Sequence, residues 1–184
     1  MVGLKADIQL SGDEDKNVKE ILGKYGWQPT EWGGAITGGY KGPIMVGGAK
    51  INAHLFYGMD ANLTLESNDP KAKKLLAKTE LAPYLERTKI KKIASVELSN
   101  EHIEQTLQKL RENGWTGEPE YGSAFTPARR VHELPTFNIQ GKEFRAQGLG
   151  NPSRTDLTLT LYCTASKTSA KKSLKNSDLA EIFS

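Results

Sequence analysis

The sequence contains the stretch Leu98-Ser-Asn-Glu-His-Ile-Glu-Gln-Thr-Leu-Gln-Lys-Leu-Arg-Glu-Asn-Gly-Trp115, which has a counterpart near the start of the chain. The counterpart is Leu10-Ser-Gly-Asp-Glu-Asp-Lys-Asn-Val-Lys-Glu-Ile-Leu-Gly-Lys-Tyr-Gly-Trp27. Both begin with Leu-Ser and end with Gly-Trp, and their residue numbers differ by 88 at each end (98 − 10 and 115 − 27). A tandem duplication is the simplest origin of two such stretches at one spacing.

Each copy predicts a strand followed by a helix. Residues 5–10 alternate apolar and polar side chains, which is the period of a strand with one buried face. Ser11 or Asp13 then caps a helix whose apolar stripe is Val18, Ile21, Leu22 and Tyr25, and Gly26 ends it. The second copy repeats this order, with a strand over 93–98, Ser99 as the cap, a stripe of Ile103, Leu107 and Leu110, and Asn113-Gly114 as the end.

Glycine-rich strands follow each of these helices. Residues 50–57 and 62–66 predict two antiparallel neighbours in the first copy. Residues 120–126 match residues 31–37 at an offset of 89 (120 − 31), and 156–159 match 62–65 at an offset of 94 (156 − 62). The growing offset predicts a longer and more basic hairpin in the second copy, which includes Arg129, Arg130, Lys142 and Arg145.

A lysine-rich helix is expected to close each copy. Asp69-Pro70 is typical of a helix start, and the segment 71–82 has high helix propensity. Residues 170–183 align with 72–85 at an offset of 98 (170 − 72), so the tail is interpreted as the second closing helix. Its end also resembles acidic, phenylalanine-ended recruiting peptides and a degenerate sliding-clamp motif. We favour packing on the sheet, by Leu174, Leu179, Ile182 and Phe183.

These patterns predict an α+β fold, in which each unit is strand, helix, three or four strands, helix, with the helices on one face of an antiparallel sheet. The predicted units are residues 1–89 and 90–184. Whether the two form one pseudo-symmetric domain with a continuous sheet is left open.

The composition contains no sign of catalysis, metal binding or cofactor binding. His54, His102 and His132 have no metal-ligand neighbour at a suitable spacing, and the single cysteine, Cys163, lies in an alternating strand as a core thiol. No nucleophile–base pair or phosphate loop is present. With no signal-peptide or membrane-spanning stretch, the sequence predicts a cytoplasmic protein, or a nuclear one in a eukaryote.

Basic residues are the main functional signal, although the net charge is only +3. Lysines recur in both closing helices, where a lysine in the first turn opposes the helix dipole. An anionic partner explains this recurrence, and a solvated lysine face inherited by both copies explains it equally well. The predicted binding residues are Arg129, Arg130, His132, Lys142, Arg145, Lys167, Lys171, Lys172, Lys73 and Lys74.

Two families share parts of this organisation. The duplicated order strand–helix–strands–helix resembles the saddle of the TATA-binding protein, which implies binding of duplex DNA through the minor groove. That family inserts phenylalanine side chains between base pairs. In this sequence the nearest aromatic residues on predicted strands are Phe56, Tyr57 and Phe144.

The second unit is similar to a double-stranded-RNA-binding domain, with Pro119-Glu-Tyr121, His132, Phe137 and 166–171 in the order of that domain. That resemblance implies a hairpin-tip contact at His132 and phosphate contacts at Lys167 and Lys171. The sequence departs from the pattern of that domain in three ways. Each unit has an extra leading strand, the hairpin is longer, and the first unit has Asp69 at the position that aligns with Lys167.

We therefore expect a non-enzymatic protein that binds nucleic acid, duplex in preference to single strand. The alternative is a protein-interaction or inhibitor protein, such as a phage or host regulator. It would use the glycine-rich strands together with Trp27, Trp32 and Tyr40 as an aromatic patch.

Overall fold

The computed structural model describes residues 3–34, 37–58, 60–123 and 128–183. The chain divides into two compact units, Met1–Thr88 and Lys89–Ser184. Each unit has a sheet of mainly antiparallel strands and its own apolar core, so the predicted α+β class is confirmed. No helix in the described part of the chain is long and apolar enough to cross a membrane.

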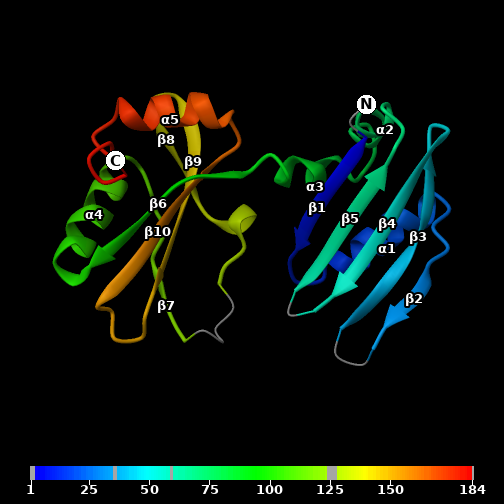
Figure 1. Cartoon of the computed structure of the whole chain (residues 1–184), viewed down its shortest axis with the longest axis horizontal. Helices are drawn as coiled ribbons and strands as arrows, with labels where there is room; N and C mark the ends of the chain where they lie inside the picture. The colour runs from blue at the N-terminus through cyan, green and yellow to red at the C-terminus, as the bar shows by residue number, and fades with distance from the viewer. Residues whose placement is uncertain (1–2, 35–36, 59, 124–127, 184) are drawn as a thin grey trace. The chain divides into compact units, whose positions relative to one another are not determined.

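The first unit is a sheet in the order β1-β5-β4-β3-β2, with every neighbouring pair antiparallel (Figure 1). The strands are β1 (Leu4–Leu10), β2 (Thr30–Gly33), β3 (Gly38–Val46), β4 (Ala49–Tyr57) and β5 (Ala61–Ser67). The helices are α1 (Glu14–Lys24), α2 (Ala72–Leu76) and α3 (Ala82–Arg87). Side chains alternate between buried and exposed along β1, because one sheet face packs on the helices and the other does not.

The second unit has the strand order β6-β10-β9-β7, and β8 also pairs with β9. Its strands are β6 (Lys91–Ser99), β7 (Glu120–Tyr121), β8 (Thr136–Ile139), β9 (Lys142–Gly150) and β10 (Asp156–Cys163). Its helices are α4 (Asn100–Glu112) and α5 (Lys167–Lys175), with a 3-10 turn, η1 (Val131–Glu133), between β7 and β8. Only β7 runs parallel to its neighbour, pairing Glu120 with Leu149, among the strands that the structure describes.

The repeated stretch forms equivalent structure in both units. Gly26 and Gly114 end the helices with positive φ angles of 77° and 89°, as predicted for left-handed stops. The backbone N–H of Trp27 donates to the Leu22 carbonyl, and that of Trp115 donates to the Leu110 carbonyl. These hydrogen bonds recur at the offset of 88 (115 − 27 and 110 − 22), so the helices of both stretches end with the same backbone hydrogen bond.

The predicted continuous closing helix over 71–82 is wrong. In the first unit α2 ends at Leu76, and α3 begins only at Ala82, next to Pro83. The Thr79 hydroxyl donates to the Leu76 carbonyl (2.7 Å) and accepts from the Leu81 N–H (3.2 Å), so a side-chain turn interrupts the helix. Asp69 caps the turn before α2, since its carboxylate accepts from the Lys71 N–H (2.8 Å).

The tail of the second unit contains the same turn. The Ser177 hydroxyl donates to the Leu174 carbonyl (2.7 Å) and accepts from the Leu179 N–H (3.3 Å), at the offset of 98 from its counterpart (177 − 79). Leu174 and Leu179 are buried, and Ile182 and Phe183 pack against the same core. The prediction that the tail packs on its own unit is confirmed.

A partly buried ion pair between Glu14 and Arg87 joins the start of α1 to the end of α3. It should make the stability of the first unit depend on acid pH. Arg87 donates to both carboxylate oxygens of Glu14, one at 2.8 Å, and the Ser11 N–H donates to the same carboxylate (2.7 Å). The hydrogen bond from Arg87 is the main cause that lowers the pKa of Glu14 to about 2. The folded state therefore favours the ionised carboxylate.

We expect Glu14→Gln to lower the free energy of unfolding of the first unit by about 1–2 kcal/mol at pH 7, allowing for solvent screening of a partly exposed pair. Because the folded pKa is depressed, this contribution is present above pH 4.5 and is lost as the pH falls toward 2. Urea unfolding of both proteins between pH 7 and pH 2 measures it. A difference that stays constant over this range would contradict the assignment.

Candidate nucleic-acid interface

Helix α5 presents a row of lysines, none of which has an acidic partner among the described residues. Its N-cap is Ser166, whose hydroxyl accepts from the Ser169 N–H (3.3 Å). Ala170, Ser173 and Leu174 are buried against the sheet, which leaves the charged side chains outside. Lys167, Lys171 and Lys175 are spaced by four residues, so they recur about every 6 Å along one side of the helix. All three are exposed, as is Lys172.

Two further lysines begin β6, which lies beside α5. Lys91 pairs with Cys163, four residues before the first lysine of α5, and Lys92 pairs with Tyr162. Both lysines are exposed. None of the six lysines of α5 and β6 forms an ion pair with any residue that the structure describes. Lys92 pairs with Tyr162, whose hydroxyl lies 3.4 Å from the Gln147 side chain on the sheet face opposite α5, so Lys92 points to that face. We call Lys91, Lys167, Lys171, Lys172 and Lys175 the lysine surface.

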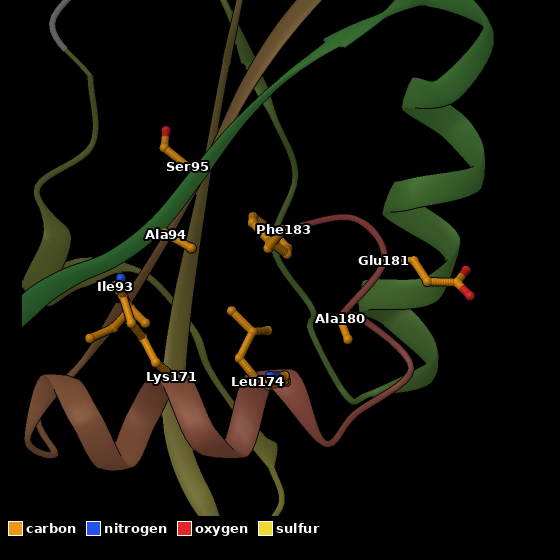
Figure 2. Close-up of a pocket in the computed structure, with 9 residues that line it drawn as sticks. Ile93, Ala94, Ser95, Lys171, Leu174, Ala180, Glu181 and Phe183 are labelled. Atoms are coloured by element: carbon orange, nitrogen blue, oxygen red, sulfur yellow. The ribbon is translucent and has the colours of Figure 1, made fainter.

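An open groove of about 750 Å³ runs between β6, α5 and the tail. Figure 2 shows Leu174 and Phe183 pointing into the groove beside Ala94, while the carboxylate of Glu181 points away from it. Lys171 and Lys175 also line this groove, at the side formed by α5. The lysine surface therefore borders a largely apolar groove, whose lining includes Glu181 with its carboxylate turned outward.

The arginines predicted from the sequence are engaged within the protein. The backbone N–H of Arg129 donates to Glu120 (2.9 Å), and its side chain lies 3.7 Å from the same carboxylate. The Arg130 guanidinium lies 3.9 Å from Glu133. Because a nearby carboxylate offsets each charge, these arginines attract phosphate less strongly than exposed lysines without partners.

Arg145 holds the chain segment 128–135 against the sheet. Its guanidinium donates to the carbonyls of Leu134 (2.6 Å) and His132 (3.3 Å), and it lies 3.7 Å from Glu143. Gln147, the next residue on the same side of β9, donates to the Arg129 carbonyl (2.7 Å). Arg145 therefore has a clear structural role in the second unit.

The predicted basic hairpin is wrong in its boundaries. The hairpin is β8–β9, which contains Lys142 and Arg145 and turns at Gln140-Gly141. Arg129, Arg130 and His132 precede it in the segment 128–135. His132 lies in η1, so it does not occupy the hairpin tip that the resemblance to RNA-binding domains implies.

The remaining predicted residues lie apart from one another. Lys142 is half-buried at the start of β9, and Lys73 and Lys74 are exposed on α2 of the first unit. The structure therefore brings Lys167, Lys171 and Lys172 together on one helix. Lys91 joins them through strand pairing, which the basic stretch before the second unit could have indicated.

The three aromatic residues of the alternative hypothesis do not share one surface. Trp27 packs against the apolar core. Tyr40 and Trp32 lie on opposite faces of the first sheet, because Tyr40 pairs with Glu31 and the neighbouring Trp32 pairs with Gly39. Tyr40 meets Tyr57 edge to face (6.2 Å between ring centroids), with the Lys19 ammonium 5.0 Å from each ring centre.

Comparison with known proteins identifies no relative. No protein-family model, no curated protein and no solved structure matches the chain. Among the residues that the structure describes, no group of three or more histidine, cysteine, aspartate or glutamate side chains is arranged to hold a metal ion.

Proposed function

We propose that this protein is a non-enzymatic nucleic-acid-binding protein, and that the phosphate backbone lies along the lysine surface. The observation that carries the proposal is the gathering of five exposed lysines, without acidic partners in the described structure, on α5 and the start of β6. Such a cluster is costly to maintain without a partner, because like charges repel one another and Lys167 opposes the dipole of α5. A polyanion offsets both effects.

Duplex nucleic acid fits this surface better than a single strand. Proteins that bind single strands without sequence preference stack bases on exposed aromatic rings. In the second unit the described aromatic side chains are buried or half-buried, so they offer little area for stacking. A lysine row on a rigid helix instead suits a backbone that is itself rigid.

The chain should bind labelled duplex DNA or duplex RNA of about 20 base pairs more tightly than a single strand of the same length. Anisotropy titrations at several salt concentrations measure this. The logarithm of the binding constant should fall linearly with the logarithm of the salt concentration, with a slope of about −4.5 if five lysines contact phosphate. Absence of salt-dependent binding near about 50 mM salt would contradict the proposal.

A further inference from the structure

In the second unit, the chain covers the sheet face that lies opposite the helices. Gln147 and Arg145 on this face donate to carbonyls of the segment 128–135. Gln147 and Thr160 are buried as a result, at 7% and 9% exposure. Leu134 of the covering segment is 5% exposed, although it does not belong to the core between sheet and helices.

The corresponding face of the first sheet is uncovered in the described structure. The hairpins β3–β4 and β8–β9 both turn through two positive-φ residues, Gly47-Gly48 and Gln140-Gly141, so β4 and β9 correspond at an offset of 93 (141 − 48). Asn52 and His54 therefore occupy the positions of Arg145 and Gln147. Neither forms a side-chain hydrogen bond with the described residues, although both side chains can donate one.

One sheet face is covered in the second unit and uncovered in the first because the strand before the hairpin differs. In the first unit β3 begins at Gly38, and its first half pairs with both β2 and β4. In the second unit β8 begins only at Thr136, and the preceding residues leave the sheet and cross its face. β7 then pairs directly with β9.

Apolar side chains stand at both ends of the uncovered face. At one end Trp32, which is 37% exposed, stacks on Phe56 with the ring centroids 5.7 Å apart. Gly39 lies between them in the sheet, and a Cβ there would come within 2.2 Å of the Leu55 carbonyl oxygen. At the other end Pro43 is exposed and Met45 is 53% exposed.

The charges on this part of the face are positive. Lys41 and Lys50 are exposed, and neither forms an ion pair with the described residues. The acidic residues of the same face lie on β1 and β5, where Asp7 accepts from Thr64 (2.8 Å) and Glu66 lies 3.6 Å from Lys5. A partner over β3 and β4 therefore meets apolar groups and ammonium groups.

We propose that this face of the first sheet binds an extended, acidic segment of a partner polypeptide. Its apolar side chains pack on Trp32–Phe56 and on Met45, and its carbonyls accept hydrogen bonds from Asn52 and His54. Its carboxylates lie near Lys41 and Lys50. Gly39 and Met45 are six residues apart on β3, about 20 Å, which an extended segment of about six residues spans.

Selection of random displayed peptides of about 12 residues on the full chain tests this proposal. The selected peptides should combine at least two large apolar residues with aspartate or glutamate. Trp32→Ser should weaken their binding by about tenfold or more, since it removes the exposed aromatic anchor of this face. Lys41→Glu should weaken the same peptides several-fold, with the loss diminishing at high salt.

Leu149→Ser is the matched control, because Leu149 is 40% exposed at the position equivalent to Phe56 in the second unit. It should leave peptide binding unchanged. Selected peptides that bind Trp32→Ser as tightly as the wild type would overturn the proposal, and so would a selection that yields no binder. Self-association of the chain that Trp32→Ser abolishes would also overturn it, because the occupant would then be a second copy.

Discussion

Neutralising the lysine row of α5 should reduce affinity for duplex nucleic acid on the order of 100-fold or more at about 0.1 M salt. The variant carries Lys167→Gln, Lys171→Gln and Lys175→Gln, which keep helix-forming side chains and remove three charges. Each lost phosphate contact should lower the magnitude of the salt slope by about 1, so three should lower it by about 3. Anisotropy titrations of wild type and variant across salt give both quantities.

The control variant removes the same number of charges from the first unit. Lys5, Lys16 and Lys24 each lie near a carboxylate, respectively Glu66, Asp13 and Glu80. Replacing these three by glutamine should change affinity less than about threefold, because they lie outside the lysine surface. Equal losses in the two triple variants would show that only net charge matters, and the proposed interface would then be wrong.

Trp115→Ala should have the largest effect on stability, lowering the free energy of unfolding of the second unit by about 3–5 kcal/mol. Trp115 is 2% exposed within the second core, and the backbone at Gly117 lies closely against its ring. Truncation leaves a cavity that the surrounding strands and helices cannot fill completely. Urea unfolding followed by far-ultraviolet circular dichroism measures the loss.

Trp115→Phe should cost less than about 1.5 kcal/mol, because the volume is largely kept. The indole nitrogen of Trp115 has no hydrogen-bond partner in the described structure, so phenylalanine loses no such bond. Trp32→Ala should stay within about 1 kcal/mol of the wild type, since Trp32 is partly exposed on an uncovered face. A similar loss for Trp115→Ala and Trp32→Ala would contradict this view of the core.

Local patterns in the sequence are sufficient to predict most elements of the fold. The apolar residues of the alternating stretch 5–10 are buried in the core of the first unit. The stripe of Val18, Ile21 and Leu22 is buried in the same core. These signals work because burial on one face requires a fixed period, which the chain displays residue by residue. Gly26 and Gly114 mark helix ends for an equally local reason, the positive φ angle.

Features that depend on competing or distant contacts could not be predicted in this way. The propensity of 71–82 favours one helix, but the Thr79 hydroxyl bonds the Leu76 carbonyl and interrupts it. The alignment of the strands of the two units is another example. Ile8 pairs with Leu63 and Val96 with Leu159, which gives β5 and β10 an offset of 96 (159 − 63) and not the 94 obtained by matching sequence letters.

The candidate site shows the same limit. Arginine in a basic stretch looks like a phosphate contact, yet Arg145 donates to carbonyls of a segment at least ten residues away. Lys171 and Lys91 are far apart in the sequence and lie on adjacent elements because β6 pairs with β10, which precedes α5. Only the tertiary fold distinguishes a charge that holds the protein together from one that faces solvent.

The most direct test of the proposed function is a titration of the ¹⁵N-labelled chain with a duplex of about 20 base pairs, followed by amide chemical shifts. We predict that the largest shifts lie in residues 167–175 and 91–95, and that they diminish as salt is raised. Shifts concentrated in the segment 128–135 or on β3 and β4, or no shifts at low salt, would contradict the assignment of the interface to α5 and β6.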